Sequence, residues 1–142
     1  MIVVDLNLLL YATNVDAPQH ERARRWWESA LNGEEQVGLT WPVLLGFLRL
    51  TTRAGLLPRP LTARQALDTI EAWLTHPLTT VLQPGDDHWA VLRRLIEEGG
   101  AAGNRTTDAH LAAVAIEYGA TLCSSDTDFS RFPSLKTVNP LE

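Results

Sequence analysis

The chain opens with a short block of branched apolar residues that an acidic residue follows at once. Ile2, Val3 and Val4 show no polar alternation, which is typical of a strand buried on both faces of a parallel sheet. Residues 6–12 are mostly apolar but contain no β-branched side chain, so they predict a short buried helix. Ligands of open parallel sheets bind beyond the carboxyl ends of the strands. Asp5, between strand and helix, is therefore either a helix cap or part of a site.

Strands and helices are predicted to alternate along the rest of the chain. The expected helices cover 19–32, 43–52, 62–74, 87–98 and 108–118, and the expected strands cover 36–40, 79–82, 120–123 and 136–138. Thr62 is expected to cap the helix that it opens, Thr106 or Thr107 to cap the last helix, and Gly119 to end it. This alternation predicts one α/β domain over residues 1–142 with a parallel sheet.

Two of the predicted helices are unusually rich in large apolar side chains. Trp26 and Trp27 lie in the first of them, and Phe47 and Leu48 lie in the second. These side chains are expected to pack in the core and also at an interface, because they exceed what a small monomer easily hides. His20, at the start of the first helix, is expected to be solvated.

Composition limits the class of protein. A chain of 142 residues with 45% hydrophobic residues is long enough for one domain with a real core. It has no apolar run of the roughly 20 residues that a membrane helix needs, and its start does not resemble a signal peptide. Cys123 is the only cysteine, which favours a reducing compartment, so we expect a soluble cytoplasmic protein. The net charge of −5 disfavours nucleic-acid binding by bulk electrostatics but allows an acidic centre that holds divalent cations.

Four aspartates are placed where they can converge on one edge of the sheet. Asp5, Asp126 and Asp128 follow predicted strands, and Asp108 begins a predicted helix. Each one alone could cap a helix or organise a turn. Together they would repel one another, and a hard divalent cation such as Mg²⁺ with oxygen ligands relieves that repulsion. Such a cation lowers the pKa of bound water and stabilises in-line displacement at phosphorus.

Three segments then resemble a known family. Residues 3–7 (VVDLN), 107–115 (TDAHLAAVA) and 123–129 (CSSDTDF) occur in the order found in the PIN-domain family, and in particular in the VapC toxins of bacterial toxin–antitoxin pairs. The resemblance implies a three-layer α/β/α domain with a central parallel sheet. It also implies a Mg²⁺- or Mn²⁺-dependent endoribonuclease that cleaves RNA, such as a tRNA or another structured RNA. A VapB-type antitoxin and a homodimer are the implied partners.

The resemblance also implies roles for individual residues. Carried over to this chain, Asp5, Asp108 and Asp126 are the metal-binding carboxylates. The residues implied to assist them are Asp128 as an auxiliary acid, and Asn7 and Ser125 as polar supports.

One usual feature of the family is missing. Its members carry a glutamate near the start of the third helix, but residues 41–45 read WPVLL here, and the nearest acids, Glu34 and Glu35, precede the strand. Asp128 or water could replace the missing ligand, or the metal could bind more weakly. A catalytically silent RNA-binding or interaction module therefore stays open as an alternative. A receiver-type phosphoacceptor domain, suggested by Lys136 near a late strand, lacks the required aspartate at 82–84.

Overall fold

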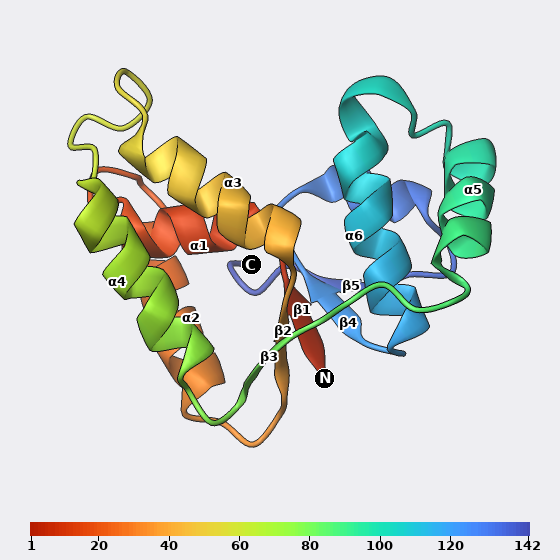
Figure 1. Cartoon of the computed structure of the whole chain (residues 1–142), viewed down its shortest axis with the longest axis horizontal. Helices are drawn as coiled ribbons and strands as arrows, with labels where there is room; N and C mark the ends of the chain where they lie inside the picture. The colour runs from red at the N-terminus through yellow and green to blue at the C-terminus, as the bar shows by residue number, and fades with distance from the viewer.

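Five short strands form one parallel sheet at the centre of the molecule (Figure 1). The structure is a computed structural model that describes residues 1–142. The strands are β1 (Ile2–Val4), β2 (Val37–Leu39), β3 (Thr79–Val81), β4 (Thr121–Cys123) and β5 (Lys136–Val138). Their order across the sheet is β3-β2-β1-β4-β5. The N-terminal strand β1 is thus central, which explains why its residues are apolar without alternation.

Six α-helices flank this sheet in two groups. They are α1 (Leu6–Thr13), α2 (His20–Leu31), α3 (Trp41–Thr52), α4 (Ala63–Leu74), α5 (His88–Gly99) and α6 (Thr106–Glu117), with short 3₁₀ helices η1 (Gly103–Arg105) and η2 (Thr127–Arg131). Figure 1 shows α1 to α4 on one side of the sheet and α5 and α6 on the other. The predicted three-layer α/β/α architecture is therefore confirmed. None of the helices combines the length and the apolar character that crossing a membrane requires.

The predicted elements agree with the observed ones apart from their ends. Thr62 caps α4 as expected, and it does so in a reciprocal capping box with Gln65. Gly119 directly follows Tyr118, the C-cap residue of α6, and has a φ of +61°, a conformation that favours glycine. The predicted cap of α6 is wrong, because η1 leads directly into this helix and Thr106 is already helical. The Thr106 hydroxyl donates instead to the carbonyl of Gly103.

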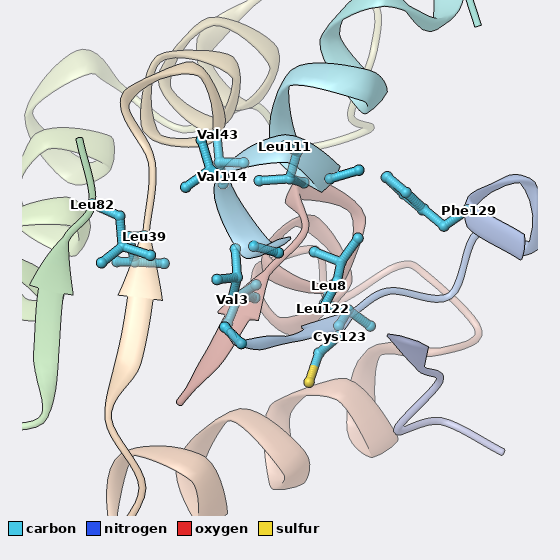
Figure 2. Close-up of a cluster of buried hydrophobic side chains, with 14 of the residues drawn as sticks. Val3, Leu8, Leu39, Val43, Leu82, Leu111, Val114, Leu122, Cys123 and Phe129 are labelled. Atoms are coloured by element: carbon cyan, nitrogen blue, oxygen red, sulfur yellow. The ribbon is translucent and has the colours of Figure 1, made fainter. Parts of the chain in front are cut away.

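One continuous core lies between the sheet and its helices. Val3 and Leu122 in the sheet belong to the same buried cluster as Leu8, Leu111 and Phe129 from the surrounding helices (Figure 2). Tight packing of this kind positions the residues that follow the strands, because the ends of β1 and β4 cannot shift without opening the core.

The apolar helices hide most of their large side chains within one chain. The ring of Trp73 on α4 lies 5.7 Å from that of Trp27 and 4.7 Å from that of Phe47. The expectation that Trp27 and Phe47 pack in the core is therefore confirmed, and both are too buried to offer much surface to a partner. The prediction for His20 is also wrong: it is half-buried, and its Nδ1 lies 2.8 Å from the carbonyl oxygen of Tyr11.

Candidate active site

The site begins where two neighbouring strands end. β1 and β4 pair in register with Val4 opposite Cys123, so Asp5 and Ser124 emerge side by side. The Asp5 amide donates to the Cys123 carbonyl at 3.0 Å, and the Ser124 hydroxyl donates to Oδ2 of Asp5 at 2.7 Å. Oδ1 of Asp5 accepts from the amide of Leu6 at 2.8 Å. Asp5 is therefore a helix cap and a member of the acidic edge at the same time.

Ser124 connects three residues of the acidic edge. Besides donating to Asp5, its Oγ accepts from the Asp126 amide at 2.9 Å and from Nδ2 of Asn7 at 3.4 Å. Oδ1 of Asn7 is buried and has no partner. Ser125, which the resemblance suggested as the polar support, makes no side-chain hydrogen bond; its neighbour Ser124 does, because that residue directly follows β4 and turns inward.

Asp108 reaches the same edge from the first turn of α6. It lines a small pocket of about 100 Å³ together with Asp5, at the junction of β1, β2 and α6. Asp126 precedes η2 and accepts from the amide of Asp128 at 2.8 Å. It also lines a second, polar pocket of about 450 Å³ with Ser125, and its charge acts on Asp5. The structure thus gathers Asp5, Asp108 and Asp126 at the carboxyl edge of the sheet.

Burial is the main electrostatic influence on these acids, and repulsion between them adds to it. Burial raises the pKa of Asp5 to about 6. Hydrogen bonds from Ser124 and Leu6 lower this pKa, whereas the charges of Asp108 and Asp126 raise it further. Burial, and then the charge of Asp126, raise the pKa of Asp108 as well. A cation placed among these carboxylates would reverse both shifts.

Asp128 differs from the other three aspartates because it has a cationic partner. Its carboxylate forms an ion pair with Arg105, and the hydrogen bond from this guanidinium lowers the pKa of Asp128. Arg105 lies next to α6, and its charge partly offsets the rise in the pKa of Asp108. Asp128 is therefore neutralised within the chain, which leaves Asp5, Asp108 and Asp126 as the acids whose charges have no cationic side chain bonded to them.

The donor set fits a hard divalent cation by its chemistry. No three histidine, cysteine, aspartate or glutamate side chains are spaced so that they enclose an ion as they stand. The three acids nevertheless offer oxygen donors only, as Mg²⁺ and Mn²⁺ prefer, and their mutual repulsion is what a cation removes. The unpartnered amide oxygen of Asn7 next to them is a further polar group of the same kind.

The start of α3 supplies no acid to this set. Pro42 and Val43 line the pocket with Asp5 and Asp108, and residues 41–45 contain no acid. Glu35 cannot supply the missing acid, because its carboxylate lies 3.0 Å from the amino group of Met1, at the opposite end of β1. The absence of this acid, expected from the sequence, is therefore a property of the folded site as well.

Sequence reasoning missed a chain of three side chains behind the pocket. Oε2 of Glu117 lies 2.5 Å from Nδ1 of His88, and Nε2 of His88 lies 2.9 Å from Nδ1 of His110, which lines the pocket. Burial, and then the proximity of His88, lower the pKa of His110. A signal was present, since His110 and Glu117 are seven residues apart and share one face of a helix. Nothing local indicates that His88 of α5 lies between them.

Comparison with known proteins agrees with this geometry. The family model described as "PIN domain" matches residues 2–135. Ribonuclease VapC33 of Mycobacterium tuberculosis is 45% identical over 141 residues, covering 99% of both chains. Ribonuclease VapC37 of the same species is 40% identical over 140 residues, covering 99% of this chain and 97% of the relative.

Solved structures show the same fold at lower identity. VapBC2 from Rickettsia felis, bound to a DNA fragment from its promoter, matches with a TM-score of 0.71 and 19% identity, covering 98% of each chain. The sarcin-ricin-loop-cleaving toxin VapC20 of Mycobacterium tuberculosis matches with a TM-score of 0.69 and 21% identity, covering 92% of this chain and 93% of that one. With a family model and full-length relatives in agreement, the chain belongs to the PIN-domain family, among its VapC ribonucleases.

Proposed function

We propose that this protein is a metal-dependent endoribonuclease toxin that hydrolyses RNA phosphodiester bonds. The observation that carries the proposal is the gathering of Asp5, Asp108 and Asp126 at one edge of the sheet, with burial raising the pKa of Asp5 to about 6. The full-length relationship to Ribonuclease VapC33 supports the substrate class. The products we expect are 5′-phosphate and 3′-hydroxyl ends.

The roles of the residues follow from their contacts. Asp5, Asp108 and Asp126 would hold Mg²⁺ or Mn²⁺, and such a cation, when bound, supplies Lewis acidity and lowers the pKa of bound water. Ser124 orients the Asp5 carboxylate through its 2.7 Å hydrogen bond and the Asp126 backbone through a 2.9 Å bond. Asn7 supports Ser124 in turn. Arg105, held by its ion pair with Asp128, places guanidinium hydrogen-bond donors beside the acids for an approaching phosphate.

Replacing Asp126 by Asn tests the proposal. The amide keeps the oxygen that accepts from Asp128 but removes a charge from the cluster. Mg²⁺-dependent cleavage of total RNA should fall on the order of 100-fold, since several kcal/mol of transition-state stabilisation are lost. Without metal, the variant should be at least as stable as the parent. Asp68→Asn, on the exposed surface of α4, is the control and should cleave normally. Equal cleavage by Asp126→Asn and the parent would refute the assignment.

A silent RNA-binding module is the second candidate. The observation in its favour is the first turn of α3, which lines the pocket through Pro42 and Val43 and adds no carboxylate to the aspartates. A silent module would bind RNA with Mg²⁺ or Mn²⁺ present and leave it intact at any enzyme concentration. Cleavage that disappears in Asp5→Ala would exclude this candidate.

We also propose that the protein forms a homodimer and is inhibited by a VapB-type antitoxin. Trp41 and Leu45 on α3 are available for a dimer contact, because they lie one turn apart and are 45% and 56% exposed. An antitoxin segment lying near the acidic edge could direct an arginine toward Asp5 and Asp108 and take the place of the cation. The buried, unpaired Cys123 agrees with a cytoplasmic location.

A further inference from the structure

The pocket beside the acids is lined by polar side chains other than the aspartates. Its wall includes Thr40 from the end of β2 and His110 from α6 in addition to Asp5 and Asp108. No lysine or arginine lines it. Apart from the two carboxylates assigned to the cation, its polar side chains, Thr40 and His110 among them, suit a neutral hydrogen-bonding group.

Thr40 brings a hydroxyl group that the protein leaves without a hydrogen bond. The residue is 1% exposed, and its Oγ1 has no partner. It stands at the N-cap position of α3 with an extended backbone, but its side chain makes no capping bond, and Pro42 in the first turn has no amide hydrogen to donate. A buried hydroxyl without a partner costs about 1–3 kcal/mol. Because Thr40 lines the pocket, a ligand there can supply the missing bond.

The orientation of the His110 ring is fixed by a hydrogen bond at one of its two nitrogens. Its Nδ1 is occupied by Nε2 of His88, whose other nitrogen is held by Glu117. The ring of His88 packs edge-on against that of His110 with centroids 4.8 Å apart. Nε2 of His110 has no hydrogen-bond partner within the chain, so it is the free end of this three-residue chain.

We propose that this pocket receives a ribose 2′-hydroxyl group of the RNA, hydrogen bonded by Thr40 and by Nε2 of His110. A 2′-hydroxyl both donates and accepts, so it complements either tautomer of His110 and the hydroxyl of Thr40. This group is also what distinguishes RNA from DNA at a given site. Glu117 and His88 are positioning residues that act through His110. The inference rests on the proposed ribonuclease function and adds to it the basis of sugar selection.

Thr40→Val is the direct test, because it keeps the shape of the side chain and removes only the unpartnered hydroxyl. Folding stability should be unchanged or higher. Binding is measured by fluorescence anisotropy with labelled 20-nucleotide single strands of RNA and of DNA of the same mixed sequence. Ca²⁺ replaces Mg²⁺, and gels verify that the probes stay intact. The parent should prefer RNA. Thr40→Val should lose about three- to tenfold in RNA affinity and nothing in DNA affinity, as expected for one hydrogen bond.

Thr79→Val is the matched control. Oγ1 of Thr79 is also buried without a partner, but this residue lies on the edge strand β3 and not at the pocket. It should bind both probes as the parent does.

Glu117→Gln tests the positioning role: it should lower the RNA-to-DNA affinity ratio and shift the ¹⁵N resonances of the His110 ring. A purely structural role would lower both affinities together.

The outcomes separate this inference from the proposed function. If Thr40→Val retains the parent's RNA preference, or loses RNA and DNA affinity equally, the 2′-hydroxyl assignment is overturned while the ribonuclease proposal stands. If the parent protein binds neither probe and cleaves no RNA, both are overturned. A loss confined to RNA in Thr40→Val, absent in Thr79→Val, supports the inference.

Discussion

At the scale of single residues, Asp5 has two roles with opposing requirements. As the cap of α1 it accepts from the Leu6 amide, a bond that favours the charged carboxylate. As a member of the acidic edge it is buried near Asp108 and Asp126, which favours the protonated form. Burial dominates, and the pKa of Asp5 rises from 3.8 to about 6. The metal-free site is thus held at a cost in stability near neutral pH.

This pKa shift predicts a pH dependence of stability. The folded state binds the Asp5 proton more tightly than the unfolded state, so the stability contributed by Asp5 is fully present below about pH 4 and is lost as pH rises through about 6. Asp5→Asn lacks the titrating group. Its free energy of unfolding, relative to the parent in EDTA, should therefore rise by up to about 3 kcal/mol between these pH values. Urea titrations from pH 4 to 7.5 measure the difference. Parallel curves for the two proteins would contradict the buried charge of Asp5.

At the scale of elements, the first turn of α3 decides how complete the acidic site is. This turn lines the pocket through Pro42 and Val43, so a side chain at either position faces the acids. Leu44, one residue further, is 1% exposed and belongs to the core. A carboxylate at Leu44 would therefore be buried without a partner and would unfold the protein, whereas one at the exposed Pro42 would not.

Pro42→Glu should accordingly restore a metal ligand. A glutamate in the first turn of a helix is favourable, and one more negative charge beside Asp5 and Asp108 attracts a cation. We expect Mn²⁺ to bind on the order of tenfold more tightly by calorimetry. Ala63→Glu places the same charge at the exposed first turn of α4 and should leave Mn²⁺ affinity unchanged. If Pro42→Glu folds and binds no more tightly, then α3 supplies no ligand position and the aspartates form the whole site.

At the scale of the whole molecule, burial changes which surface can form a dimer. Trp27 and Phe47 are used within the chain, in contact with Trp73. The large apolar side chains that remain exposed on α3 are Trp41 and Leu45. Large apolar side chains one turn apart on the same helix form a small patch that a second copy can cover.

Leu45→Glu tests this surface. A charge at the centre of an apolar contact should convert the dimer to a monomer, as measured by light scattering at high micromolar concentration. Trp89→Gln is the control, since Trp89 is 70% exposed but lies on α5, on the other side of the sheet (Figure 1). It should remain dimeric. A parent protein that is already monomeric at this concentration would rule out the homodimer.

The sequence by itself determined the order of elements and the location of the acidic edge. The unalternating apolar run at 2–4 predicted a buried parallel strand, and parallel strands end at one edge, so Asp5 and Asp126 had to meet there. The capping box at Thr62 and the glycine at Gly119 were equally predictable. These features depend on local periodicity, local turn chemistry and one rule of sheet topology, and short segments of the sequence are enough to recognise them.

Only the tertiary structure decided which side chains meet across those elements. Ser124 rather than Ser125 contacts Asp5 because of the register between β1 and β4, two strands more than a hundred residues apart. The packing of α5 on α6 brings His88 to His110. The same holds for Thr40, whose hydroxyl is unpartnered because of what surrounds it and not because of its neighbours in sequence. Contacts between distant segments depend on register and helix rotation, and a shift of one residue in either changes every partner.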